Sequence, residues 1–566
     1  MTRDTDPRAD ERTDADGLES TERTARTDGG EATAGADSVA LDPWGSSTVS
    51  DYRKLFEEFG IEEFDEVLPE VPNPHYLMRR GVIFGHRDYR PVVDAMREGD
   101  DCAVLSGFMP TGDPHIGHKL VFDEIIWHQE RGADAYGLIA DLEAHSARGL
   151  SWEEIDEHAR DYLLSLLALG FDAEEGTLYR QSDNRELQDL AFELGSKARF
   201  SEFEAIYGFD GETSVSHMQS VVTQMADILY PQLDGPKPTV IPVGPDQDPH
   251  VRLARDLAAR TRFFKVTEAY ASFEADALER DVIGEAYAAL SADAPAASDG
   301  EGDEAENGDE DGTTGGEPVR CEDAADWLES GEFDRARLGV DVSQAAVEAA
   351  IEKLRAAGKE PLRPRVRFLD RNATEEAFEA LIEAVEGEKR VFEAHVDTFA
   401  LSREEAEELA RGIEIEHGGY GFVPPSSVYH RFMTGLTGGK MSSSVPASHI
   451  SLLDDPEDGY DKVKSATTGG RETAELQREL GGEADKCPVY ELYAYLLAGD
   501  DDEFAKTVYD ECVGGERLCG DCKEQAARLM REFLEEHREK RAEAEEVLAE
   551  LDVDLHSNRR GVTSED

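Results

Sequence analysis

The chain has 566 residues, 39% of them hydrophobic, and a formal net charge of −68 at pH 7. Because one hydrophobic core does not serve so long a chain, we expect two or three domains joined by linkers. No run of about eighteen apolar residues occurs, which excludes a transmembrane helix, and the polar N-terminal stretch lacks the apolar core of a secretory signal.

The acidic residues are spread over the whole length, and lysine is scarce. Such self-repulsion is best screened by concentrated salt, since the Debye length falls to about 3 Å at molar ionic strength. The charge therefore predicts a high-salt cytoplasm and says nothing about a partner. Six cysteines in so long a chain do not make a disulfide scaffold, and they favour a reducing, cytoplasmic setting.

The chain begins with a segment that predicts a disordered acidic tail (1–43), followed by an N-terminal extension (44–100). Strand-like and helix-like patterns then alternate over 101–280. Apolar runs of strand length are 102-CAVLSGFMPTG-112, 135-AYGLIAD-141, 177-TLYRQSD-183 and 239-TVIPVG-244. Between them, 120–129 and 151–170 have helical spacing, the latter opened by a Ser-x-x-Glu capping box. This alternation predicts an α/β fold, a Rossmann-like parallel sheet.

The second half of the chain is interrupted by segments of other composition. Residues 281–318 contain no Lys or Arg, and they predict an acidic disordered linker. Helical spacing at 347–354 and 378–385 predicts an inserted, mainly helical subdomain over 319–423. We expect the catalytic domain to return over 424–465 and an all-α domain to occupy 466–566.

Two histidines in 115-HIGH-118 follow the first apolar run and a Gly/Pro turn. They could be metal ligands, satisfied structural histidines or phosphate donors. For the third possibility, free backbone N–H groups at a helix start face an anion, and Gly112 and Gly117 let a nucleotide approach. Far along the chain, 438-GGKMSSSVPASH-449 is either a polar surface turn or a mobile loop that grips phosphate with Lys440.

Together, HIGH and KMSSS resemble the paired signatures of class I aminoacyl-tRNA synthetases. The segments 223-TQMADILYP-231, 241-IPVGPDQDPHVRLARDLAAR-260, 464-KSATTGGRETAELQRELGG-482 and 80-RGVIFGHRDY-89 are similar to the tryptophanyl branch of archaeal and eukaryotic type. The resemblance covers roughly 76–275 and 424–548. It implies that the C-terminal helices bind the anticodon.

The resemblance also implies a role for each matching residue. His115, His118 and Lys440 would be catalytic. ATP would be held by Thr111, Gly112, His115, Gly117, His118, Asp246, Lys440, Met441, Ser442, Ser443 and Ser444. Tryptophan would be held by Leu105, Gln224, Asp227 and Gln247, with Asp227 accepting the indole N–H. Leu105 and Leu138 replace a tyrosine and a glutamine of the eukaryotic pocket, so a tyrosyl-tRNA synthetase stays open.

The implied reaction is activation of L-tryptophan by ATP with Mg²⁺, followed by transfer to the 3′ end of tRNA(Trp). The resemblance further implies a homodimer, no membrane and a cytoplasmic enzyme. A non-catalytic paralogue that binds RNA or nucleotide is the main alternative outside catalysis. A small-metabolite nucleotidyltransferase would explain HIGH but not the long helical C-terminal part.

Two smaller features have weaker alternatives. Cys512, Cys519 and Cys522, with Cys487 as a fourth, could bind zinc, but free buried cysteines are favoured and no metal is expected. Within 353-KLRAAGKEPLRPRVRFLDR-371, three arginines share one face of a strand: Arg363, Arg365 and Arg367. They either neutralise neighbouring acids on a solvated face or meet tRNA phosphate.

Overall fold

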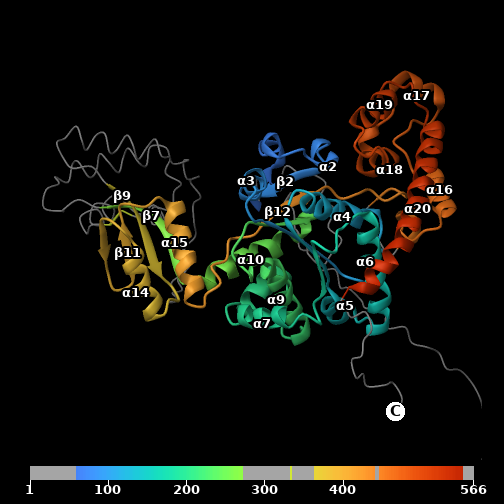
Figure 1. Cartoon of the computed structure of the whole chain (residues 1–566). Helices are drawn as coiled ribbons and strands as arrows, with labels where there is room; N and C mark the ends of the chain where they lie inside the picture. The colour runs from blue at the N-terminus through green and yellow to red at the C-terminus, as the bar shows by residue number, and fades with distance from the viewer. Residues whose placement is uncertain are drawn as a thin grey trace, which may run out of the picture. The chain divides into compact units, whose positions relative to one another are not determined.

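The computed structural model describes residues 56, 59–271, 332–333, 363–439, 441, 445–551 and 553. The predicted tail (1–43) and acidic linker (281–318) lie outside these residues, as does most of 319–362. The described strands form two sheets, one of seven strands and one of five (Figure 1).

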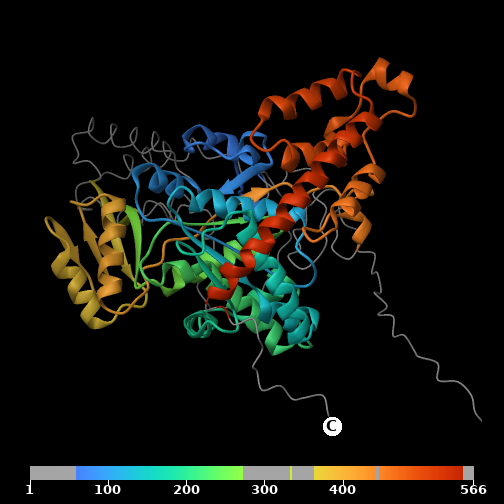
Figure 2. The ribbon, with the colours of Figure 1, turned by 45° about the vertical axis from the view of Figure 1, so that its right-hand side comes forward.

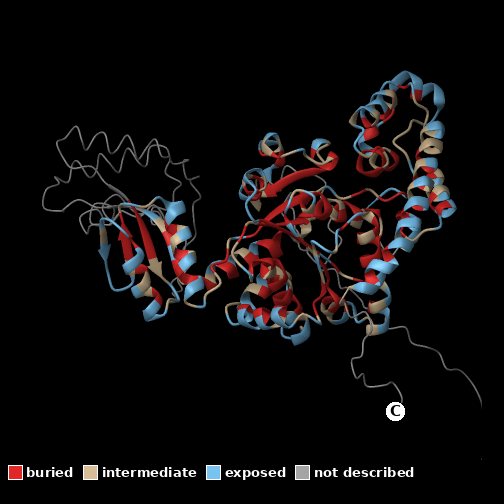
Figure 3. Cartoon of the chain, viewed as in Figure 1, coloured by how far each residue is buried: buried red, intermediate tan, exposed pale blue. Residues whose placement is uncertain are grey.

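The seven-stranded sheet has the order β1-β2-β12-β6-β3-β4-β5. Its strands are β1 Glu62–Glu63, β2 Ile83–Arg87, β3 Ala103–Phe108, β4 Asp134–Ile139, β5 Thr177–Arg180, β6 Thr239–Val243 and β12 Ser426–His430. From β12 to β5 all neighbours are parallel, whereas β2 pairs antiparallel with β12 and β1 with β2. The central strands are buried along most of their length, as their continuous apolar runs require (Figure 3). The Rossmann-like α/β class is confirmed.

Helices connect and cover these strands. Their bounds are α2 Tyr76–Arg79, α3 Arg90–Glu98, α4 Ile116–Gln129, α5 Asp141–Arg148, α6 Trp152–Leu169, α7 Arg185–Gly195, α8 Phe200–Tyr207, α9 Val215–Leu229 and α10 Asp248–Thr261. Helix α6 starts with the expected capping box between Ser151 and Glu154 and ends at Gly170, whose φ of 117° suits only glycine. None of the described helices is long and apolar enough to cross a membrane.

The second sheet is antiparallel, with the order β10-β11-β9-β7-β8. Its elements are β7 Phe264–Ala271, β8 Glu332–Phe333, β9 Arg363–Asp370, α14 Glu375–Ala384, β10 Lys389–Val391, β11 His395–Thr398 and α15 Arg403–Glu416. Apolar residues of the sheet and both helices form one core, among them Phe264, Phe368, Leu381, Val396 and Ala410.

The described part of 319–423 combines strands β9, β10 and β11 with helices α14 and α15, so an antiparallel sheet lies beside the expected helices. The mainly helical character of the whole segment stays a prediction. Strand β7, expected within the catalytic domain, pairs with β9 in the second sheet. The helical spacing at 378–385 falls on α14 and the start of the loop after it, whereas the spacing at 347–354 lies outside the described residues.

All regular elements between residues 456 and 551 of the described chain are helices. The elements are α16 Pro456–Ser465, α17 Ala474–Leu480, α18 Pro488–Leu492, a π-helical turn Tyr493–Leu497, α19 Asp502–Val513 and α20 Cys519–Glu550. The long α20 packs against α16 and against α6 of the parallel-sheet domain (Figure 2). At this contact Arg541 donates to Asp161 Oδ1 at 2.7 Å and to Ser165 Oγ at 2.6 Å.

Candidate active site

A cavity of about 250 Å³ lies at the carboxyl ends of β3, β4 and β6. Parallel α/β sheets bind ligands at this edge, because the strand ends and helix starts meet there. Helices α5, α9 and α10 complete the wall. All four residues expected to hold tryptophan line this one cavity: Leu105, Gln224, Asp227 and Gln247.

The polar end of the cavity is built around Asp227 of α9, which is 2% exposed. Tyr179 Oη donates to its Oδ1 at 2.9 Å, and Gln181 Nε2 donates to its Oδ2 at 2.6 Å. Burial raises the pKa of the Asp227 carboxyl to about 8, although both hydrogen bonds act in the opposite direction. In addition, Gln181 Oε1 and Gln224 Oε1 are buried without a hydrogen-bond partner among the described residues. This end of the cavity is therefore rich in acceptors and suits a ligand N–H.

Tyr179 and Gln181 were not expected from the sequence. They stand two residues apart at the end of β5 and so face the same side of the sheet. The run 177-TLYRQSD-183 predicted the strand, and two polar side chains at a strand end were the available signal. The opposite walls are apolar, with Leu105 and Leu138 among them.

His115 and His118 lie at the start of α4 and hold each other in place. Their rings stack with centroids 3.8 Å apart. The backbone N–H of Gly117 donates to His115 Nδ1 at 3.1 Å, and that of His115 donates to His118 Nδ1 at 3.1 Å. A ring nitrogen that accepts carries no proton, so each neutral imidazole has its proton on Nε2.

Burial favours this neutral state of both rings. It lowers the pKa of His115 to about 3 and that of His118 well below its usual value. His118 lines the cavity, and its Nε2 lies 3.3 Å from Tyr162 Oη. Among the described residues, no group of three potential metal ligands includes either histidine, so nothing supports the metal alternative. Two Nε2–H donors at a helix start are suited to an anion.

The glycine at position 117 leaves room for the histidine pair and for Met441 of the KMSSS segment. A Cβ there would lie 2.9 Å from His115 Cε1 and 3.5 Å from Met441 Sδ, so Met441 reaches the HIGH segment. The rest of that loop, Lys440 with Ser442, Ser443 and Ser444, lies outside the described residues. Gly112 has open space around it, and Thr111 is partly exposed in the turn before α4. Asp246 lies in a 3-10 turn after β6, beside the cavity-lining Gly244 and Gln247.

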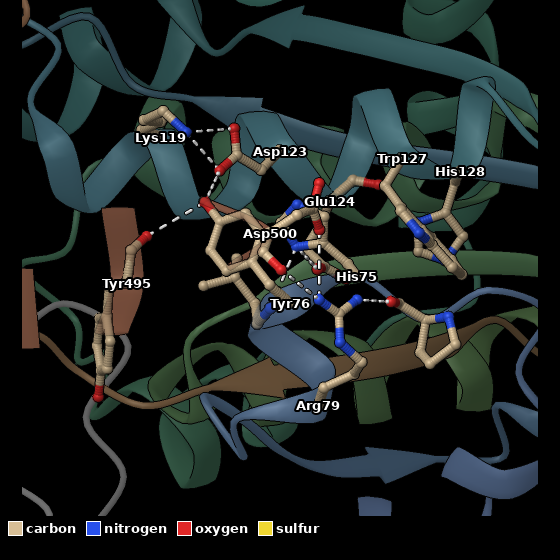
Figure 4. A network of polar contacts seen from close by, with 12 residues as sticks. His75, Tyr76, Arg79, Lys119, Asp123, Glu124, Trp127, His128, Tyr495 and Asp500 are labelled. Carbon is tan, nitrogen blue, oxygen red and sulfur yellow. Dashed lines mark hydrogen bonds and ion pairs between the residues drawn. The ribbon is translucent and has the colours of Figure 1, made fainter. Parts of the chain in front are cut away.

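Hydrogen bonds through α2 connect the first two turns of α4 to the C-terminal helices (Figure 4). Lys119 Nζ pairs with Asp123 at 2.6 Å. Tyr76 Oη donates to Asp123 Oδ2 at 3.0 Å and lies 3.3 Å from the carbonyl oxygen of Tyr495. Next to Tyr76, Arg80 donates to the carbonyl groups of residues 494 and 499 at 2.9 and 2.6 Å. The helix that carries both histidines is thus linked to the helical domain.

Two of the three arginines considered for tRNA phosphate do not face solvent. Arg365 and Arg367 are 5% and 6% exposed, and both pair with Asp397 of β11 at 3.1 and 2.8 Å. Asp397 is the direct cross-strand neighbour of Arg367, so the counter-charge is local. The side chain of Arg363 lies outside the described residues. Binding of tRNA phosphate by Arg365 and Arg367 is therefore not supported.

Comparison with known proteins gives consistent matches over most of the chain. Residues 97–272 and 399–535 match the family described as tRNA synthetases class I (W and Y). A protein of Halobacterium salinarum named tryptophan–tRNA ligase 1 is 69% identical, over 93% of this chain and 98% of that protein. The tryptophan–tRNA ligase of Methanosarcina acetivorans is 44% identical, over 91% and 98%. The crystal structure of tryptophanyl-tRNA synthetase from Aeropyrum pernix K1 has a TM-score of 0.58 at 30% identity and covers 91% of this chain and 100% of its own.

Proposed function

The chain belongs to the tryptophanyl-tRNA synthetases of class I, and we propose that the cavity at the ends of β3 and β6 is its tryptophan site. As a tryptophan–tRNA ligase, the protein uses ATP to activate tryptophan and joins it to tRNA(Trp). The three relatives described above are all named for tryptophan, which favours that amino acid over tyrosine. The proposed site rests on one observation. A single cavity is lined both by hydrogen-bond acceptors and by His118 of the HIGH segment.

The indole ring is expected to lie between the apolar walls, with its N–H directed at Asp227. Leu105 and Leu138 on neighbouring strands offer a flat apolar surface, and Asp227 with the free Oε1 atoms of Gln181 and Gln224 offers acceptors. A site that hydrogen-bonds one substrate group rejects analogues lacking that group far more strongly than an apolar slot does. Gln247, which lines the same cavity, would meet the ammonium or carboxylate of the substrate.

ATP is expected over the start of α4. There the Nε2–H groups of His115 and His118 would donate to phosphate oxygens. The open space around Gly112 leaves the backbone accessible, and Gly117 leaves room for the His115 ring. Thr111 and Asp246 would border the nucleotide. Lys440, with Met441 and Ser442, Ser443 and Ser444, would close over the leaving phosphates.

The tryptophan carboxylate attacks the α-phosphorus of ATP, which gives tryptophanyl-adenylate and pyrophosphate. The acyl group then passes to the terminal adenosine of the tRNA. No protein nucleophile is required, because positioning and stabilisation of charge at phosphorus lower the barrier. Lys440 suits this task, since a cation that reaches the phosphates in the transition state binds most strongly as charge develops.

We expect Mg²⁺ to arrive on the phosphates of ATP as part of the substrate. The described residues offer one candidate group beside the HIGH segment, Asp113, His158 and Asp161. Asp161 is already paired with Arg541 at 2.7 Å, and histidine is a poor ligand for this ion. These residues do not fit a Mg²⁺ site of the protein's own.

The resemblance to this family also supports a homodimer and an anticodon-binding role for the C-terminal helices. The sparse cysteines, free in the part of the chain that the structure describes, support a cytoplasmic location. Sedimentation of the full chain in molar salt tests the dimer, for which a mass of twice the chain is expected. A single-chain mass would overturn it.

The test of the function is ATP–pyrophosphate exchange in molar salt with each amino acid in turn. Exchange stimulated by tryptophan alone is the expected result. Stimulation by tyrosine would favour a tyrosyl enzyme, and no stimulation by any amino acid would favour a non-catalytic paralogue. Variants of Leu105 and Asp227 then test whether the cavity is the tryptophan site, because they should change the KM for tryptophan only if tryptophan binds there.

A further inference from the structure

A second cavity, of about 570 Å³, lies where α10 runs into strand β7 of the second sheet. Its described walls also include the loop after β9, one side of α15 and the loop before β12. Besides the acidic Glu407, six basic residues line it: Lys197, Arg260, Arg262, Lys265, Arg371 and Arg411. In the whole chain Asp and Glu outnumber Lys and Arg by 126 to 58, so the balance of charge is reversed at this cavity.

Hydrogen bonds hold the loop after β9 against the end of α10. Asn372 Nδ2 donates to the carbonyl oxygens of Arg260 and Arg262 at 2.9 and 2.8 Å. The backbone N–H of Arg371 donates to the carbonyl oxygen of Phe263 at 2.9 Å. The backbone thus fixes Arg371 at the wall of the cavity.

Two of the arginines share one carboxylate. Arg262 Nη2 and Arg411 Nη2 lie 3.2 and 3.3 Å from the same oxygen, Glu407 Oε2. Arg262 also pairs with Glu414 at 2.7 Å, whereas Arg411 Nε is buried without a hydrogen-bond partner among the described residues. Burial and the positive charge of Arg262 lower the pKa of Arg411. An anion in the cavity would offset this contact between like charges.

Three other cations of the cavity have no counter-charge. Lys197, Lys265 and Arg371 form no ion pair with any residue that the structure describes. Lys265 and Arg371 are exposed, and Lys197 is half-buried. They come from three separate segments: the loop after α7, strand β7 and the loop after β9. The fold therefore gathers three positive charges that an anion from outside the chain can reach.

The arrangement of these three side chains suits a nucleic-acid backbone. Lysine and arginine side chains supply many of the protein contacts to nucleic-acid phosphates. Exposed cations from separate segments can each meet a different phosphate of one strand. The acidity of the rest of the chain is a small obstacle, since at molar ionic strength the Debye length is about 3 Å and only groups in contact attract or repel strongly.

We propose that this cavity binds the phosphate backbone of tRNA, with Lys197, Lys265 and Arg371 as the phosphate contacts. The inference rests on the proposed function, which supplies tRNA as the nucleic-acid partner. Helix α10 begins beside the tryptophan cavity and ends here, and its 14 residues span about 21 Å. The contacts are thus too far from the candidate active site to take part in tryptophan activation. They hold another part of the tRNA whose 3′ end lies in that site.

The test is binding of a tRNA(Trp) transcript to the full chain over a series of KCl concentrations, without ATP or tryptophan. Joint replacement by Lys197→Gln, Lys265→Gln and Arg371→Gln should raise the Kd about tenfold at the lowest salt that keeps the chain folded. It should also lower the slope of log Kd against log salt by about 2, since each phosphate contact contributes about 0.7–0.9.

A pair of single variants provides the matched control. Arg371→Gln should weaken tRNA binding, whereas Arg403→Gln should not, because Arg403 is an equally exposed arginine of α15 that does not line the cavity. Equal Kd values for the two variants would overturn the site, as would a triple variant with the wild-type Kd and salt slope.

ATP–pyrophosphate exchange separates this inference from the proposed function. Exchange with tryptophan should keep its wild-type rate in the triple variant, which also shows that the variant folds. If the triple variant loses exchange, the two single variants decide. A wild-type chain without exchange would refute the function, and the tRNA measurement would still decide the site.

Inorganic phosphate and pyrophosphate are the remaining probes. If they raise the unfolding temperature of the wild type but not of the triple variant, while tRNA binds both chains equally, the cavity takes small anions and the RNA contact is overturned.

Discussion

The surroundings of Asp227 predict that tryptophan binds more tightly as the pH rises towards 8. Burial raises the pKa of this carboxyl to about 8, so the empty site holds it largely protonated at neutral pH. An indole N–H donated to the carboxyl favours its ionised form. Binding must then release a proton, and affinity must increase with pH until the free site is itself ionised.

The size of the effect follows from the change in the acceptor. A hydrogen bond to a charged partner contributes about 1.5–3 kcal/mol and one to a neutral partner about 0.5–1.5 kcal/mol. The difference of about 1–1.5 kcal/mol corresponds to roughly a tenfold change in Kd.

The same raised pKa of Asp227 affects the stability of the fold without ligand. Because the carboxyl titrates near 4 when unfolded, its protonation stabilises the protein at acid pH, and this stability is lost as pH rises through about 8.

The assay is equilibrium binding of tryptophan without ATP, from about pH 6 to about pH 8.5. Asp227→Asn should abolish the pH dependence and bind like the wild type at low pH, and Gln181 can rotate its unpaired Oε1 to accept from the new amide. Glu143→Gln is the control, since Glu143 lines the same cavity and burial raises its pKa to about 7. A wild-type affinity that does not change with pH, or an unaltered profile in Asp227→Asn, would refute the placement of the indole N–H.

Three further changes test other parts of the site and fold. Lys440→Ala should slow ATP–pyrophosphate exchange by about 10²-fold or more with little change in the KM for tryptophan, and an unchanged rate would remove it from catalysis. Gly117→Ala should raise the KM for ATP, because the added Cβ would lie 2.9 Å from His115 Cε1. The control Gly412→Ala should have no effect, because the space around Gly412 is open. Equal KM values for the two variants would contradict a steric role of Gly117. Asp397→Ala should lower the free energy of unfolding by about 3–5 kcal/mol in urea titrations, since it removes the buried carboxylate that both buried guanidinium groups contact, and a loss below about 1 kcal/mol would show that other groups compensate the two charges.

The parallel sheet and the candidate site were accessible to sequence reasoning because their signals are local. Continuous apolar runs predict buried parallel strands, and the residues that follow such strands gather at one edge of the sheet. For this reason Leu105, Asp227 and Gln247, which are far apart in the chain, line a single cavity.

The missed features depend on contacts between distant segments. Tyr179 becomes a pocket residue only because α9 brings Asp227 to the end of β5. The arginines of β9 resemble a solvated strand face until β11 places Asp397 opposite them. Alternating Arg and apolar residues thus describe a buried ion pair and an exposed face equally well, and only the packing separates the two.

The place of β12 in the parallel sheet has a consequence for how the protein is made. This strand lies between β2 and β6, yet the second sheet separates it from both along the chain. While the ribosome produces the intervening residues, β2 and β6 each keep an edge of unpaired backbone N–H and C=O groups. Such edges invite pairing with other nascent chains, and they are covered only once β12 has been made and inserted between them.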